Sequence, residues 1–222
     1  MSTHTMKTTL ATGLATAVAA ATVAVTAPAA PAAAESSQPA HHRLGTTSLA
    51  TVLAADGHGF DKNWGDFDIL DRAVTTVLKA KPHSPVALLT KGGQRATVFA
   101  PTDRAFKRLA RSLTGTAPRT ERATFNTLAA AAGIDTIEAV LLYHVVPGKT
   151  LTSAKVVKAD GAQLKTAQGG VVAVKVSKRG VRLIDQDPNA TDARAVPRLL
   201  DINKGNRQVA HGIDRVLRPI DL

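Results

Sequence analysis

The fold is best predicted from the stretch Thr97-Val98-Phe99-Ala100-Pro101-Thr102-Asp103-Arg104-Ala105-Phe106. Its first four residues are apolar or β-branched, which favours a short buried strand. Pro101 ends that strand, and Thr102 has the side chain of a helix N-cap. Asp103 then falls in the first helical turn, where the helix dipole favours an anion. The stretch therefore predicts a strand, a turn and a helix in direct succession.

Helical periodicity extends on both sides of this stretch. Apolar residues at helical spacing predict a short helix over residues 48–53. A second helix is expected to begin near Asp66 or Asp68, with an aspartate as its N-cap. A later helix is expected to start at Asp135, where Glu138 completes a partial capping box.

The second half of the chain has the period of strands. From Val145 onward apolar residues recur at every second position, most clearly in residues 172–176 and 181–183. Lys178-Arg179-Gly180 fits a hairpin loop between these two runs. A last strand is expected over residues 213–217. Helices followed by strands predict an α+β domain.

The N-terminal segment indicates export. No charged residue occurs in residues 8–34, and a small-x-small pattern stands before Glu35. These features predict that residues 1–34 are a cleavable signal peptide. A membrane anchor is the alternative, but two prolines and weakly hydrophobic alanines suit a spanning helix poorly.

The rest of the chain divides into a short polar segment and one domain. Residues 35–47 are expected to form a tether, in which His41 and His42 are more typical of a mobile linker than of a metal site. Residues 48–222 are then long enough for one domain with a proper core.

Composition narrows the possible functions. The chain has no cysteine, which excludes disulfides, thiolate metal sites and a cysteine nucleophile. Aromatic residues make up only 3%, which argues against a base-stacking or sugar-stacking platform. The formal net charge of +11 favours anionic partners such as acidic polysaccharide, wall polymer or membrane headgroups. Export makes nucleic acid an improbable partner.

Three segments resemble the signatures of the fasciclin family. They are the stretch 97–106, the segment 141–148 around Tyr143-His144, and the segment 209–219. The signature residues that carry the first and third matches are Thr97, Val98, Phe99, Ala100, Pro101, Thr102, Asp103, Phe106, His211, Ile213 and Asp214. One departure is Gly212, which replaces a β-branched residue and is expected to loosen the last strand.

The resemblance covers about Leu49 to Leu222. It implies a single fasciclin-like domain, a wedge of mixed β-strands with helices packed on one side. It also implies a secreted or cell-surface protein that acts in adhesion without chemistry, so we predict no catalytic residue, no cofactor and no metal site.

Tyr143 and His144 are the first candidate binding residues. They either contact a partner or hold the fold, and the structural interpretation expects His144 to bond the loop at Thr102 and Asp103, because buried polar groups are nearly always paired. His211 is expected to be satisfied locally, since a general base needs a placed partner.

Four basic residues form a second candidate site, which we call the basic stripe: Arg104, Lys107, Arg108 and Arg111. Their spacing puts them on one helix face, either as a solvated face or as a docking face for an anionic polymer. Asp185-Gln186-Asp187 resembles the start of a calcium loop, but the sixth and twelfth positions lack the required glycine and glutamate. A polar turn is the interpretation we favour there.

The sequence thus predicts a secreted binding or adhesion module. Its expected partner is an extracellular polysaccharide, a cell-wall polymer or a cell-surface protein, with peripheral surface association and no transmembrane span in the mature chain. A structural envelope component held by charge is the alternative. A wall-polymer hydrolase is a weaker one, because no G-x-S-x-G elbow occurs.

Overall fold

The computed structural model describes residues 43–220, apart from residues 56 and 58. The expected signal peptide, His41 and His42 lie outside the described residues. The helices are α1 (Leu49–Leu53), α2 (Asp68–Ala80), α3 (Asp103–Thr114), α4 (Glu121–Tyr143) and α5 (Ser153–Val156), with 3-10 helices η1 (Pro85–Thr90) and η2 (Pro197–Leu199). The strands are β1 (Ala96–Pro101), β2 (Val145–Pro147), β3 (Gln163–Lys165), β4 (Val171–Ser177), β5 (Gly180–Ile184), β6 (Ala193–Arg194) and β7 (Gln208–Ile213).

The first sheet is built around β1. This strand lies between β2, which is antiparallel to it, and β7, which is parallel to it. Every residue of β1 and of β7 is buried. A strand covered on both faces needs a continuous apolar run rather than an alternating one. The strand and helix predicted from residues 97–106 are confirmed as β1 and α3.

The second sheet has the order β3-β4-β5-β6, and all its neighbours are antiparallel. Its residues alternate, with Val172, Val174 and Leu183 facing the core. Gly180 closes the β4–β5 hairpin with φ 101, a left-handed conformation that favours glycine. The predicted hairpin is therefore confirmed.

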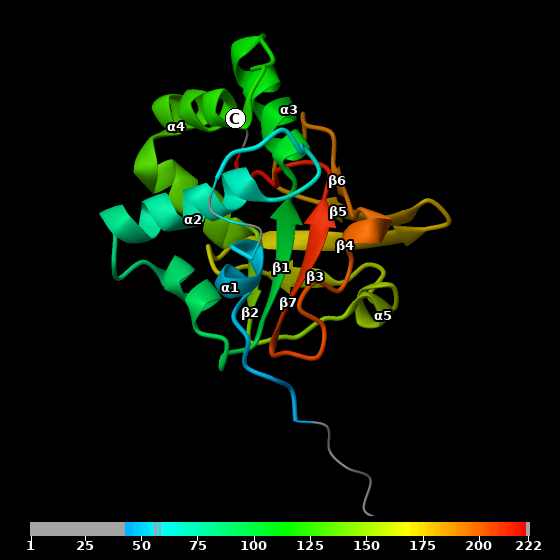
Figure 1. Cartoon of the computed structure of the whole chain (residues 1–222). Helices are drawn as coiled ribbons and strands as arrows, with labels where there is room; N and C mark the ends of the chain where they lie inside the picture. Colours follow the sequence, from blue (N-terminus) through cyan, green and yellow to red (C-terminus); the bar gives the residue numbers. More distant parts are fainter. Residues whose placement is uncertain (1–42, 56, 58, 221–222) are drawn as a thin grey trace, which may run out of the picture. The chain divides into compact units, whose positions relative to one another are not determined.

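The helices cover one side of the first sheet, as expected for an α+β domain. Figure 1 shows α1, α2 and α4 to the left of β1 and β7, β5 and β6 to their right, and β4 crossing behind them. One hydrophobic cluster joins the helices to β1, and a second fills the space between the two sheets around Phe99, Leu183 and Ile213. Aliphatic side chains dominate both clusters.

The starts of the first two helices were predicted with different success. α1 begins where expected, and the Ser48 hydroxyl accepts a hydrogen bond from Thr51 N at 3.2 Å. The aspartate N-cap of α2 was wrong, because Phe67 occupies that position and makes no side-chain cap. The capping oxygens come instead from Asp103, which is distant in sequence.

The helix predicted from Asp135 is confirmed as the second half of α4, whereas the first half was not predicted. α4 begins at Glu121, and a break at Gly133 (φ 71, ψ 168) divides it just before Asp135. Glu138 forms an ion pair with Lys81 rather than a capping box. The alanines before Gly133 carry no apolar period, so the first half of the helix left no pattern to detect.

Within the described residues, α4 is the one helix with the length and hydropathy of a membrane span, with a mean hydropathy of 1.3. Length and composition alone give this result. The break at Gly133 leaves each half well short of the roughly 20 residues that cross a bilayer. Both halves also stand beside other elements of the domain, with Leu128 and Leu141 buried in the core.

The last strand lies earlier than predicted. Residues 208–213 form β7, so the expected strand over 213–217 was wrong. Gln208 hid the pattern, because it is polar and yet fully buried. Its side chain accepts a hydrogen bond from Leu49 N at 2.8 Å and donates one to Leu88 O at 2.7 Å.

Gly212 does not loosen this strand. It pairs with Ala100 of β1, and its carbonyl accepts a hydrogen bond from Val196 N at 2.8 Å. A Cβ at position 212 would stand 2.5 Å from Leu199 Cβ. Glycine is therefore what allows η2 to approach the strand closely.

Part of the segment expected as a tether is bonded to the domain. Gly45 N donates to Gly205 O at 2.9 Å, and Arg207 N donates to Gly45 O at 3.0 Å. Thr47 N also donates to the side chain of Asn206 at 3.0 Å. The described chain is thus attached from Gly45 onward.

Candidate functional site

The signature residues lie in β1, in the start of α3 that follows it, and in or directly after β7. Ten of the eleven are buried, and only Asp214 is partly exposed. The Thr97 hydroxyl donates to Lys149 O and accepts from Leu151 N, both at 2.8 Å. The burial of these signature residues and the hydrogen bonds of Thr97 indicate that they stabilise the fold.

Tyr143 and His144 are also interior residues. Tyr143 is fully buried, and its hydroxyl donates to Val171 O at 2.7 Å. Burial raises the pKa of Tyr143 to about 12. The structure therefore gives its phenol a main-chain partner rather than a place on the surface.

His144 bonds two main-chain groups that differ from the expected loop. Its Nδ1 lies 2.7 Å from Val140 O, and its Nε2 accepts a hydrogen bond from Leu217 N at 2.8 Å. The expected bonds to Thr102 and Asp103 were wrong. Burial lowers the pKa of His144 to about 4, so the ring is neutral at pH 7. It ties the end of α4 to the segment after β7.

His211 is satisfied in the same way. Its Nε2 lies 2.7 Å from Leu151 O, and its Nδ1 accepts from Asp201 N at 3.3 Å. Burial also lowers the pKa of His211. Both ring nitrogens of both histidines are engaged by the main chain, which leaves neither imidazole placed to take a proton from a substrate.

The N-termini of three helices meet at an acidic junction. Asp68, Asp103 and Glu121 are the first residues of α2, α3 and α4, and all three are buried. Asp103 caps α2, because its Oδ1 accepts from Ile69 N at 2.9 Å and its Oδ2 from Asp68 N at 3.2 Å. The helix dipoles favour these anions.

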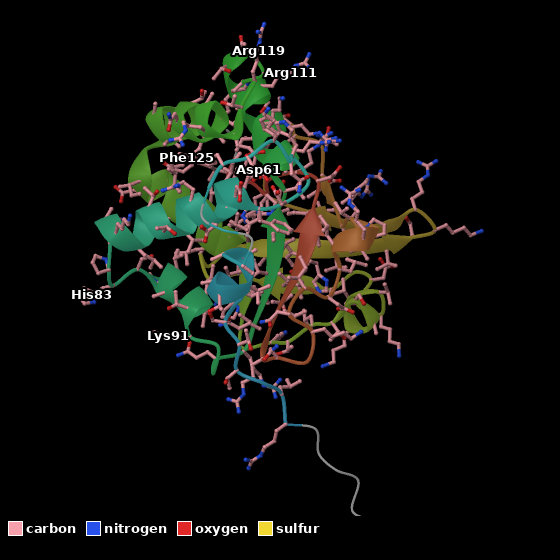
Figure 2. All side chains as sticks on the ribbon, in the orientation of Figure 1. Asp61, His83, Lys91, Arg111, Arg119 and Phe125 are labelled. Atoms are coloured by element: carbon pink, nitrogen blue, oxygen red, sulfur yellow. The ribbon has the colours of Figure 1, made fainter. Side chains whose placement is uncertain are left out.

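The segment 61–68, which we call the acidic loop, adds Asp61 and Asp66 to the junction. Figure 2 shows Asp61 above the arrowhead of β1. The loop is fixed to α3, since Asp103 N donates to Asp66 O and Arg104 N donates to Trp64 O. Burial, followed by the hydrogen bond that protonated Asp103 donates to Asp66, raises the pKa of Asp103 to about 9.

The second acidic segment, Asp185-Gln186-Asp187, is held by an arginine, and we call it the acidic turn. Arg218 N donates to Asp185 Oδ2 at 2.8 Å, and Arg218 Nη1 lies 3.0 Å from Asp187 Oδ2. Burial alone would raise the pKa of Asp187, but hydrogen bonds from Asn189 N and Arg218 and the charge of Arg218 hold it below its usual value. The negative charges of the acidic turn are therefore balanced within the chain by Arg218.

The basic stripe lies along α3, as the spacing predicted. Lys107 Nζ lies 3.9 Å from the centre of the Trp64 ring, which is a cation–π contact. Arg108 Nη1 donates to Asp214 O at 2.8 Å. Arg104 and Arg111 are exposed, and Figure 2 shows Arg111 at the outer end of α3. Intramolecular contacts thus engage two of the four residues.

A second basic surface crosses the outer face of the second sheet. Lys175 on β4 is directly opposite Arg182 on β5, and Arg182 is directly opposite Arg194 on β6. We call these three residues the cationic row. Lys178 and Arg179 at the hairpin tip join them around a hollow of about 440 Å³. All five cations therefore line one surface.

An apolar groove of about 460 Å³ lies between α2, α3 and α4. Phe106, Leu109, Phe125, Ile137 and Val140 are among its lining residues. Its volume is in the range of small-molecule sites. The few polar groups that would orient a ligand are not among its lining residues, apart from Thr136.

Sequence reasoning missed the cationic row and the acidic loop. The row depends on the register of three strands, which no local pattern reveals. The loop did carry a signal, since Asp61, Asn63, Asp66 and Asp68 place oxygen-bearing side chains at short intervals. That signal is less regular than the strict alternation at Asp185 and Asp187.

We compared the chain with family models, curated proteins and solved structures. The family model of the fasciclin domain matches residues 73–219. No curated protein matches the sequence significantly. A solved structure of a FAS1 domain pair from the insect cell adhesion molecule fasciclin I matches at a TM-score of 0.45 and 16% identity, over 66% of this chain and 45% of that one. This chain thus spans less than half the length of that protein.

Fasciclin domains occur in extracellular or cell-surface proteins and serve generally as binding or adhesion modules. No catalytic family is indicated. The matched residues cover about two thirds of the chain, including β1, the Tyr143-His144 segment and β7. This chain therefore belongs to the fasciclin domain family.

Proposed function

We propose that this chain is an exported, non-enzymatic adhesion module that binds an anionic extracellular polymer, such as an acidic polysaccharide or a wall polymer. The observation that carries the proposal is the cationic row. Lys175, Arg182 and Arg194 stand side by side on three neighbouring strands, at the roughly 4.8 Å spacing of a sheet. A linear anion laid across the strands would meet the three charges in succession.

The fold itself gains nothing from this arrangement. Like charges directly opposite each other in a sheet are destabilising. Two acids moderate the repulsion by forming ion pairs, because Asp160 lies 3.8 Å from Lys175 and Asp192 lies 3.5 Å from Arg182. These pairs are largely exposed and contribute little to stability. An arrangement that the fold does not need is best explained by a partner.

The row is better suited to this role than the basic stripe. Lys107 and Arg108 of the stripe are engaged by Trp64 and by Asp214. Two charges of the stripe, Arg104 and Arg111, have no such contact among the described residues. The row and its hairpin tip gather five cations around one hollow, and Asp160 and Asp192 pair with two of them. The net charge supports attraction to the same polymer at long range.

Two alternative functions, an envelope component and a wall-polymer hydrolase, would require different features of the structure. An envelope component held only by charge would depend on net charge and not on the row. A wall-polymer hydrolase would need a placed base, and His144 and His211 are both buried with both ring nitrogens bonded to the main chain. The geometry therefore supports binding over hydrolysis.

The test compares two double variants on an acidic polysaccharide column. Lys175→Gln with Arg182→Gln removes two charges from the row, and Arg104→Gln with Arg111→Gln removes two from the stripe. We expect the first pair to lower the salt concentration needed for elution clearly more than the second, because salt screens exposed charges. All four positions are at the surface, so the free energy of unfolding should change by less than about 0.5 kcal/mol per substitution.

An equal loss in both variants would show that net charge alone governs retention, and would favour the envelope component. Retention of the wild type on an uncharged polysaccharide at high salt would instead require a different kind of site.

A further inference from the structure

Five carboxylates converge where α2, α3 and α4 begin. Three belong to the acidic loop, namely Asp61, Asp66 and Asp68, and the others are Asp103 and Glu121. Residues 61–68 thus meet the first turns of two later helices, although about 35 and 60 positions separate them along the chain. The resulting oxygen cluster is separate from the surface proposed to bind a polymer.

The distances within the junction suit one ion. One oxygen each from Asp61, Asp66 and Asp68 lie within 4.8 Å of one another, and the same holds for Asp66, Asp103 and Glu121. Two ligands on opposite sides of a Ca²⁺ ion stand about 4.8 Å apart, because each oxygen lies about 2.4 Å from the metal. Asp66 belongs to both groups and marks the centre.

A second observation points to a ligand. Glu121 is fully buried, and its Oε1 has no hydrogen-bond partner among the described residues. Asp66 Oδ1 is likewise buried without a partner there. Native proteins leave very few buried polar atoms unsatisfied. A carboxylate only accepts hydrogen bonds, so each of these oxygens calls for a donor or a cation.

The neighbouring protein groups satisfy only part of the cluster. Asp103 uses its oxygens to cap α2, and Glu121 Oε2 accepts from Asp61 N at 2.7 Å. Each helix dipole supplies the equivalent of about half a positive charge. Main-chain N–H groups and helix dipoles thus offset part of the repulsion between the five carboxylates.

The chemistry of the donors selects the ion. All five side chains offer oxygen, and hard cations prefer oxygen ligands, whereas Zn²⁺ sites use mainly nitrogen and sulfur. Mg²⁺ demands a near-ideal octahedron at about 2.0–2.1 Å, while Ca²⁺ accepts irregular sets of six to eight oxygens. A loop joined to two helix ends is an irregular set.

We propose that the junction of the acidic loop with α3 and α4 binds one Ca²⁺ ion, with Asp66 and Glu121 as its central ligands. The ion would join residues 61–68 to the first turns of α3 and α4. It would thereby order the loop that carries Trp64, against which Lys107 of the basic stripe packs.

The acidic loop contains a built-in reporter for the test. Trp64 is the single tryptophan of the chain and lies between Asp61 and Asp66. Tb³⁺ replaces Ca²⁺ at oxygen sites, and its emission is sensitised by a nearby indole. We expect sensitised emission that saturates at one Tb³⁺ per chain and is displaced by Ca²⁺. A Kd for Ca²⁺ of about 10⁻⁴–10⁻³ M is expected for an extracellular module.

Two double variants separate a site from general acidity. Asp66→Asn with Glu121→Gln removes the central ligands, and we expect Ca²⁺ affinity to fall about tenfold or more. Asp160→Asn with Asp192→Asn removes one exposed and one partly exposed acid outside the junction and should leave affinity unchanged. Circular dichroism of both variants in chelator establishes that they are folded.

Three outcomes would overturn the proposal. The first is no Ca²⁺ binding by equilibrium dialysis up to about 10 mM, well above the expected Kd. The second is an equal loss of affinity in the two variants, which would indicate diffuse attraction to acidic groups. The third is tighter binding of Mg²⁺ than of Ca²⁺. A Trp64→Phe variant that loses Tb³⁺ emission but keeps Ca²⁺ binding would support the placement.

Discussion

The acidic turn and the acidic loop look alike in sequence and differ in their compensation. In the turn, the Arg218 side chain lies 3.0 Å from Asp187, and its main-chain N–H binds Asp185. In the loop, buried oxygens of Asp66 and Glu121 lack hydrogen-bond partners among the described residues. One segment is therefore complete within the chain, and the other calls for something from outside it.

This difference shows that alternating acidic residues in a sequence do not by themselves identify a cation site. What decides the matter is whether the fold brings a basic group or a donor to the buried oxygens. Arg218 comes from beyond β7, about 30 positions after the turn. The spacing within the turn contains no information about it.

The largest effect is expected from removing that arginine. Arg218→Met leaves Asp187 buried without its partner, and loss of one member of a buried pair costs about 3–5 kcal/mol. We expect the thermal midpoint to fall by about 10 °C, given about 2–4 °C per kcal/mol for a domain of this size. Thermal unfolding followed by circular dichroism measures the change.

Arg108→Met is the matched control, because Arg108 pairs with Asp214 at 3.5 Å in an exposed position. Its loss should cost at most about 1 kcal/mol. Equal effects of the two substitutions would mean that burial does not distinguish the compensated turn from an ordinary surface pair.

The next largest effect concerns the dependence of stability on pH. Burial lowers the pKa of His144 to about 4 in the folded chain, against about 6.5 when unfolded. Between these values the unfolded chain binds a proton that the folded chain does not, so stability falls as pH falls from 6.5 to 4. Once His144 is fully protonated, the free energy of unfolding is about 3 kcal/mol lower than at pH 7.

Urea unfolding of the wild type and of His144→Gln at pH 7 and pH 4.5 tests this prediction. The wild type should lose more stability than the variant over that interval. Burial also lowers the pKa of His211, so His211→Gln should reduce the acid loss in the same direction. An acid loss of the same size in all three proteins would assign it to other groups.

The smallest effect has the opposite sign. In chelator, Asp66→Asn with Glu121→Gln removes two charges from a repelling cluster and should raise stability by about 1–2 kcal/mol, the scale of a pKa shift of one to two units. Thermal midpoints measured without metal test this. A decrease would show that the carboxylates of the acidic loop are already satisfied, as those of the acidic turn are.

Local sequence patterns predicted the elements with regular periods. Residues 97–106, the β4–β5 hairpin and α1 were recovered because each has an apolar period and a recognisable end. The errors occurred where the period was hidden. Alanines concealed the first half of α4, and the buried amide of Gln208 concealed the start of β7.

The family, the α+β class and the positive charge could be predicted from the sequence, since signatures, periods and composition are local or additive properties. The tertiary structure alone decided what each polar side chain does. It gave His144 its main-chain partners, brought Arg218 to Asp187, aligned the cationic row, and gathered five carboxylates where three helices begin. The physical reason is that compensation of a buried polar group depends on neighbours distant along the chain, and chain folding alone chooses those neighbours.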